Sequence, residues 1–150
     1  MTKFVNFIGL FALFGLIWAM PASALAADQV VTLYKSPLCG CCMGWAEHLR
    51  RSGFKVDIRN TETLSTIKTR LGVPAELQSC HTARVGEYVI EGHVPAADIE
   101  KLLAGGRSIR GLAVPGMPVG SPGMEQVGRS MPYIVFAFDT DGRRSEFSAH

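Results

Sequence analysis

The period of hydrophobic and polar positions changes along the chain, and each change marks an expected element of secondary structure. Residues 30–34 are β-branched and aromatic, which is typical of a buried strand. Apolar positions recur at helical spacing over 41–52, and residues 54–59 then alternate strictly, as in a half-buried strand. Residues 64–71 return to helical spacing and end at Gly72. The first half therefore predicts strand, helix, strand, helix, an order typical of parallel strands covered by helices.

The second half of the chain is less regular. We expect a strand within 87–94, a helix over 95–103 and a closing β-hairpin formed by 133–138 and 143–148. Residues 105–132 are rich in Gly, Pro and Met and predict a long loop. Pro132 stands just before the hairpin, where thioredoxin-type folds place a cis proline. The pattern thus predicts an α/β, thioredoxin-like fold with an insertion of about residues 79–129 before the C-terminal β-hairpin.

The first 26 residues have a different pattern. A short positive start leads into an apolar run over 4–20, and Ala24 and Ala26 have the A-x-A arrangement of a cleavage site. This is the three-part pattern of a secretory signal peptide. An uncleaved membrane anchor is the alternative, because the run approaches the length that spans a bilayer. Pro21 and the A-x-A site favour cleavage. We therefore expect a signal peptide at 1–26, one domain at 27–150, and no membrane association after cleavage.

The charge composition argues against nucleic acid as a binding partner. The chain has 15 Lys and Arg against 13 Asp and Glu, and no basic run, so it lacks the electrostatic footprint of a nucleic-acid-binding protein. Export would place its four cysteines in an oxidising compartment, where thiols tend to pair. An even number of cysteines fits two disulfides, but their spacing fits other chemistry as well.

Cys39, Cys41 and Cys42 lie within four residues at the expected N-terminus of the first helix. There the helix dipole and free N–H groups favour thiolate over thiol, which makes sulfur a better nucleophile and a better metal ligand. One interpretation uses Cys39 and Cys42 as the C-x-x-C pair of an exported oxidoreductase. Another pairs the motif with Cys80 in structural disulfides. The first leaves Cys41 without a role, and the second makes no use of the helix terminus.

A metal site would use all three thiols of the motif. Thiolates select soft ions such as Cu(I), whereas structural zinc prefers four ligands from two well-separated pairs. The crowded motif therefore favours copper, and closely set thiolates predict a multinuclear cluster. Cys80 follows the second predicted helix and is expected to be a fourth ligand or, alternatively, a resolving thiol.

Two histidines and two methionines are further candidate ligands. His81 directly follows Cys80 and is either an imidazole ligand or a surface histidine, and His93 has the same alternatives. Met117 and Met124 stand in Pro/Gly segments with no apolar stripe around them, which weakens their interpretation as core residues. A thioether suits Cu(I) and needs no deprotonation.

Together these motifs resemble those of the exported CopG-type copper-resistance proteins, a family of predicted metal-binding proteins. The resemblance is carried by residues 33–42 (LYKSPLCGCC), 79–82 (SCHT), 91–95 (EGHVP) and 111–118 (GLAVPGMP). It covers nearly all of the chain after the leader, with no departure from the cysteine pattern. It implies a thioredoxin-like fold in the bacterial periplasm and copper bound through the C-x-C-C cysteines and Cys80. It also implies a role in copper tolerance by changing copper between Cu(I) and Cu(II).

The leading hypothesis is thus a periplasmic copper-binding protein whose partners are copper ions and other periplasmic copper-handling proteins. Whether it is an enzyme stays open, because a passive copper buffer or chaperone would bind the metal in the same way. The alternative is an exported thiol–disulfide oxidoreductase that uses Cys39 and Cys42. The two differ in their need for Cys41.

Overall fold

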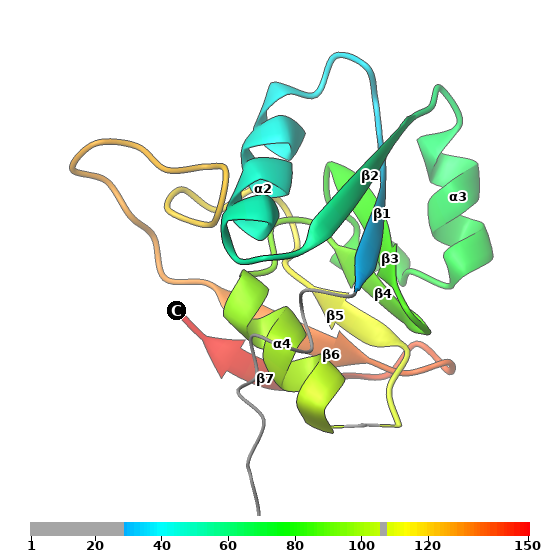
Figure 1. Ribbon diagram of the computed structural model, residues 1–150. Helices are drawn as coiled ribbons and strands as arrows, with labels where there is room; N and C mark the ends of the chain where they lie inside the picture. Colours follow the sequence, from blue (N-terminus) through cyan, green and yellow to red (C-terminus); the bar gives the residue numbers. More distant parts are fainter. Residues whose placement is uncertain (1–28, 106–107) are drawn as a thin grey trace, which may run out of the picture.

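The computed structural model describes residues 29–105 and 108–150, which form a seven-stranded sheet with helices on both faces (Figure 1). The strands are β1 (Val30–Lys35), β2 (Lys55–Asn60), β3 (His81–Val85), β4 (Tyr88–Glu91), β5 (Gly111–Ala113), β6 (Ile134–Phe138) and β7 (Arg144–Ala149). The helices are α2 (Gly40–Arg51), α3 (Leu64–Leu71), α4 (Ala96–Gly105) and the short 3₁₀ helix η1 (Ala75–Leu77). The predicted leader, residues 1–26, lies outside the described residues.

The sheet has the strand order β2-β1-β3-β4-β5-β6-β7. The pairs β1–β2 and β4–β5 are parallel, and the other four pairs are antiparallel. The expected α/β class is confirmed, as are the four elements predicted in the first half and the closing hairpin β6–β7. Among the helices of the described residues, none has both the length and the apolar character that a membrane span requires.

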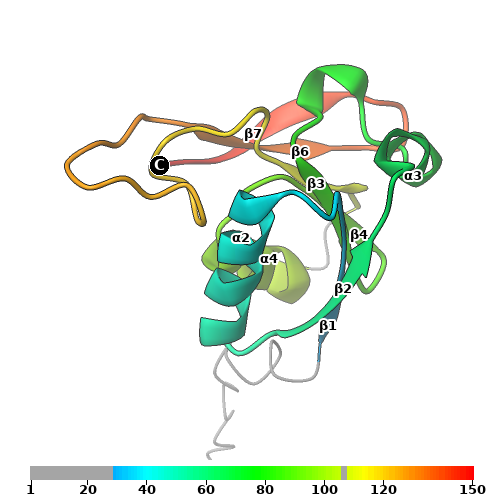
Figure 2. The same cartoon turned by 90° about the horizontal axis from the view of Figure 1, so that it is seen from above.

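Helices cover both faces of the sheet. Figure 2 shows α2 and α4 on one face and α3 on the other. Trp45 and Leu49 of α2 belong to the larger core cluster, and their helical spacing places them on the face that covers the sheet. Neighbouring strand residues alternate between the two layers: Ile90 belongs to this larger core, whereas Val89 belongs to the smaller one.

Residues 79–129 contain the predicted strand β4 and the predicted helix α4, and they also contain two strands that were not predicted, β3 and β5. They differ from the expected insertion because β3, β4 and β5 lie in the middle of the sheet. Strand β5 has only three residues, too few to show alternation. It approaches its neighbour closely: a Cβ on Gly111 would lie 1.9 Å from the Val89 carbonyl oxygen, so only glycine fits there. The long loop predicted from the sequence is therefore shorter, covering residues 114–133.

The sequence left the isomer of Pro132 open, and the structure makes its peptide bond trans, since none of the described peptide bonds is cis. Pro132 is exposed and precedes β6, which three strands separate from β1. It therefore does not enter the sheet beside the cysteine motif.

Candidate metal centre

The ends of four neighbouring strands lie side by side at one edge of the sheet, and the segments next to them carry the candidate site. The last residue of β1, Lys35, pairs with the first residue of β3, His81. The last residue of β4, Glu91, pairs in turn with the last residue of β5, Ala113. The segments that follow β1, β4 and β5 and the one that precedes β3 therefore leave the sheet side by side. They carry, in chain order, the C-x-C-C motif, Cys80, His93 and Met117.

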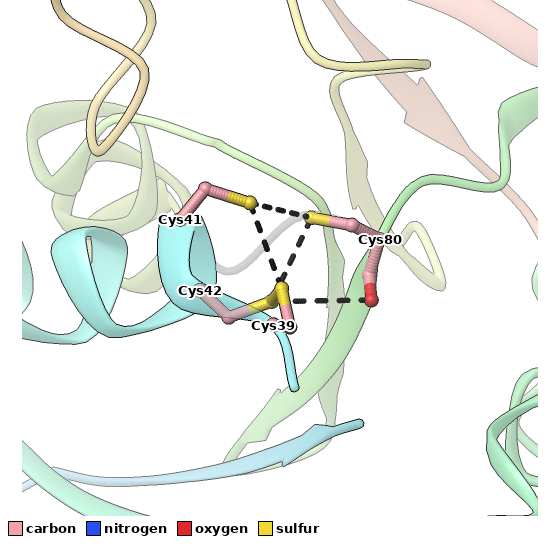
Figure 3. A group of neighbouring side chains, drawn as sticks. All are labelled: Cys39, Cys41, Cys42 and Cys80. Atoms are coloured by element: carbon pink, nitrogen blue, oxygen red, sulfur yellow. Dashed lines mark hydrogen bonds between the residues drawn. A yellow bond between two sulfur atoms is a disulfide. The ribbon is translucent and has the colours of Figure 1, made fainter. Parts of the chain in front are cut away.

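The four cysteine sulfurs form one cluster (Figure 3). Cys39 is the N-cap of α2, and Cys41 and Cys42 lie in its first turn. Cys41 Sγ is 3.5 Å from Cys39 Sγ and 3.8 Å from Cys80 Sγ, and Cys42 Sγ is also 3.8 Å from Cys80 Sγ. The sheet therefore brings Cys80 to the helix terminus from a sequence separation of 39 residues.

The structure contains a disulfide between Cys39 and Cys42, while Cys41 and Cys80 are free thiols. All four sulfurs could act as metal ligands only after this disulfide is reduced, because a metal binds thiolate sulfur. In the oxidised form, Cys41 and Cys80 are the two cysteine donors that remain.

Two imidazoles extend the cluster on the Cys80 side. Cys80 Sγ lies 3.1 Å from His93 Nε2 and 3.3 Å from His81 Nδ1, so one sulfur belongs to both the four-cysteine group and a Cys-His-His group. His93 Nδ1 lies 2.7 Å from the Pro122 carbonyl oxygen, which can only accept. Nδ1 of His93 therefore holds the proton, and its Nε2 lone pair faces Cys80, the arrangement typical of a metal-ligating histidine.

Burial keeps the imidazoles of His81 and His93 uncharged, the form in which a ring nitrogen can bind a metal. His81 and His93 are fully buried, which excludes the surface alternative for both. Burial lowers the pKa of His81 well below its usual value, reinforced by the nearby His93, and burial also lowers the pKa of His93. Nε2 of His81 has no hydrogen-bond partner among the described residues, although it is buried.

The two candidate methionines differ in position. Met117 Sδ lies 4.0 Å from Cys41 Sγ, and Met117 is 51% exposed, so its thioether borders the cluster on the solvent side. Met124 shows backbone hydrogen bonds with Ser121 and Gly120. Within the described part of the chain no hydrogen bond joins its thioether to the four sulfurs, and ligation by Met124 stays a prediction.

Electrostatics distinguish Cys80 from the helix-terminal cysteines. Burial, together with the neighbouring Cys41, raises the pKa of Cys80 to about 12, and the more distant Lys68 opposes this shift. The expectation that a helix N-terminus favours thiolate thus does not extend to Cys80, which lies just before β3. Without metal, Cys80 is a protonated thiol at neutral pH.

Several supporting residues were not predicted from the sequence. The ring of Trp45 lies 4.5 Å from that of His81, and its Nε1 donates to the Val94 carbonyl at 2.8 Å. The only sequence signal for this role was that Trp45 stands three residues after Cys42, on the same helix face. Lys68 and Glu91 form a buried ion pair, and Glu91 contacts Ser79, the residue before Cys80. Nothing in the sequence pattern indicated this pair.

The donor set fits copper. Cysteine sulfur, thioether and neutral imidazole are soft or borderline ligands that suit Cu(I), and imidazole suits Cu(II) as well. The two donor groups of the described residues contain no Asp or Glu, the hard ligands that Mg²⁺ and Ca²⁺ require.

Comparison with known proteins agrees with this chemistry. Residues 77–124 match the family described as "Protein of unknown function, DUF411". No curated protein matches the chain. Form 2 of a copper resistance protein CopG superposes with a TM-score of 0.78 at 43% identity, covering 81% of this chain and 98% of that one. Form 1 gives a TM-score of 0.77 at 43% identity, covering 81% and 96%. At this identity and coverage, the chain belongs to the CopG family of copper resistance proteins.

Proposed function

We propose that this chain is an exported, periplasmic copper-binding protein that contributes to copper resistance, with copper ions as its cargo. One observation carries the proposal: four cysteine sulfurs from two distant segments converge, and the Nε2 lone pair of His93 faces one of them, Cys80 Sγ. The predicted signal peptide at 1–26 supports export, and 27–150 would be the mature copper-binding domain.

The cluster holds more than one copper ion when all four cysteines are reduced. Two sulfurs that share a metal through bonds of about 2.3 Å lie at most about 4.6 Å apart. The sulfur contacts of Cys41 and Cys80 meet this limit. Because Cys80 also belongs to the Cys-His-His group with His81 and His93, its thiolate would serve both groups of ligands.

The same donors would support interconversion of Cu(I) and Cu(II), in which each conversion exchanges one electron with oxygen or another redox partner. The four cysteines and Met117 favour Cu(I), whereas His81 and His93 give the Cys80 side donors that both oxidation states accept. Copper would be exchanged with other periplasmic copper-handling proteins through the half-exposed Met117 side.

A second candidate function is exported thiol–disulfide oxidoreductase. The disulfide between Cys39 and Cys42 at the N-terminus of α2 favours it, because this position and spacing are those of a redox-active pair.

Metal content and free-thiol count of the mature chain, isolated anaerobically after copper exposure, test the two functions. We expect more than one copper per chain with all four thiols shielded from alkylation. A metal-free chain that retains the disulfide would overturn the copper proposal and leave the oxidoreductase. N-terminal sequencing of protein from the periplasmic fraction tests export, with Ala27 as the expected first residue.

A further inference from the structure

A buried ion pair lies beside the cluster but outside its donor set. Lys68 of α3 and Glu91 at the end of β4 have side chains that are only 6% and 0% exposed. Lys68 Nζ donates to the Glu91 carboxylate and, at 2.9 Å, to Thr82 Oγ1. Such a pair is weak grounds for stability, since replacing both charges with apolar residues is often neutral or stabilising. Stability alone therefore does not account for a buried Lys68–Glu91 pair at this position.

The Glu91 carboxylate holds the backbone next to Cys80. Its Oε1 accepts the backbone N–H of Ser79 at 2.6 Å, and its Oε2 accepts the hydroxyl of Thr82, also at 2.6 Å. Ser79 and Thr82 enclose Cys80 and His81 in sequence. Residues 78–80 belong to no helix or strand, so this carboxylate supplies a restraint that regular backbone pairing does not.

The same chain of contacts reaches Met117. Ser79 Oγ donates to the carbonyl oxygen of Gly116, the residue that precedes Met117. One buried carboxylate is thus connected, through Ser79, to donors on two separate segments: the Cys80 thiol and the Met117 thioether.

The backbone just after β4 lies close to Ser79 on one side. Gly92 has a φ of +70°, and a Cβ there would lie 2.6 Å from Ser79 Oγ and 2.5 Å from the Val114 carbonyl oxygen. Gly92 therefore lies at backbone distance from Ser79, and the segment after β5 contacts Ser79 through the hydrogen bond to Gly116. A small displacement of Ser79 would shift Cys80 and the loop that carries Met117 together.

We propose that Glu91 is a positioning residue that fixes the Cys80 and Met117 sulfurs against the C-x-C-C motif, with Lys68 neutralising its buried charge. This inference rests on the proposed copper function. It assigns Glu91 no contact with copper: the carboxylate acts through Ser79.

Two double variants of nearly equal volume test the role of the acceptor. Lys68→Met with Glu91→Gln removes both charges and keeps an amide oxygen for the Ser79 N–H, whereas Lys68→Met with Glu91→Leu removes the acceptor as well. Outer partners of metal ligands contribute about 10–100-fold to metal affinity. We expect the Gln variant to bind Cu(I) as the wild type does and the Leu variant to bind it about 10–100-fold more weakly in anaerobic chelator competition. Equal Cu(I) affinity in the two variants would overturn the inference.

If the Leu variant does not fold, a double-mutant cycle of Ser79 and Met117 tests the same connection with smaller changes. Ser79→Ala leaves the Glu91 contact to the backbone and removes only the hydroxyl that reaches Gly116. If that hydroxyl positions Met117, the affinity loss from Ser79→Ala should vanish in a Met117→Leu background. A loss of equal size in both backgrounds contradicts the proposed connection.

A copper-free readout separates this inference from the proposed function. In a Cys39→Ala, Cys42→Ala background, Cys41 and Cys80 are the remaining thiols, 3.8 Å apart. Mild oxidation should join them several-fold more slowly with Lys68→Met and Glu91→Leu than with Lys68→Met and Glu91→Gln. Equal rates reject positioning by Glu91, whether or not copper binds. A wild type that binds no copper rejects the proposed function alone.

Discussion

Replacing Cys41 by alanine separates the two candidate functions, because Cys41 is central to the sulfur cluster and outside the disulfide. Its Sγ lies 3.5 Å from Cys39 Sγ, 3.8 Å from Cys80 Sγ and 4.0 Å from Met117 Sδ. Loss of a partner that only orients a ligand costs about 10–100-fold in metal affinity, so loss of this direct donor should cost at least about 100-fold. That factor corresponds to about 2.8 kcal/mol of binding free energy. The fold should survive, since alanine is favourable in the first turn of a helix.

Anaerobic competition with a chromophoric Cu(I) chelator measures this affinity, and the copper number should fall as well. Leu38→Ala is the matched control, because Leu38 is 95% exposed in the adjacent loop. Reduction of a protein disulfide, assayed in parallel, should be unchanged in Cys41→Ala if Cys39 and Cys42 form the redox pair. Wild-type copper number and affinity in Cys41→Ala would refute the reasoning that places Cys41 in the copper site.

Three further predictions concern protonation and supporting contacts. His93→Gln should weaken Cu(I) binding about tenfold or more in the same competition while leaving the disulfide intact, because it removes the nitrogen that faces Cys80. Since the pKa of Cys80 is raised to about 12, copper binding at pH 7 should release its proton, so affinity should rise with pH. Calorimetry in buffers of different ionisation enthalpy would show this proton, and a Cys80→Ala variant that releases equally many would contradict the assignment. Burial lowers the pKa of His48, whose Nε2 accepts the Ala96 N–H at 3.0 Å. The stability this gives should be complete above the ordinary histidine pKa and lost as pH falls toward the lowered value, a trend in urea unfolding that His48→Gln should lack.

The sequence predicted those elements that are long enough to show a clear hydrophobic period. Helix α2 has that length, and its pattern decides which face is buried. In strand β2 the alternating Val56 and Ile58 pack partly buried against the core. Strand β5 was missed because three residues carry no period, and its place depends on the close approach of Gly111 to Val89. Pro132 precedes the hairpin as predicted, but its distance from the cysteine motif was not predictable because the sequence does not tell which strand lies beside β1. That follows from the pairing of β1 with β3.

For the site, the residue types were predictable but their grouping was only partly so. The C-x-C-C motif can be recognised from its spacing alone. Cys80 and His93 come close to it only through the pairing of strand ends, which no local sequence pattern indicates. The proton on Nδ1 of His93 depends on the Pro122 carbonyl, and the restraint on Cys80 depends on Glu91. Both are contacts between residues far apart in the chain, with no motif of their own.

The spread of the donors along the chain makes copper a ligand of the folded state. Cys41 and Met117, neighbours in the cluster, are separated by 76 residues. An unfolded chain keeps the C-x-C-C thiols together but scatters Cys80, His93 and Met117, so it should bind copper more weakly than the folded chain. A ligand present at 100 times its Kd, with no affinity for the unfolded chain, adds about 2.7 kcal/mol to folding stability. Copper-loaded chains should therefore resist unfolding and proteolysis longer than empty ones, and the amount of this protein that survives in the cell should follow the copper supply.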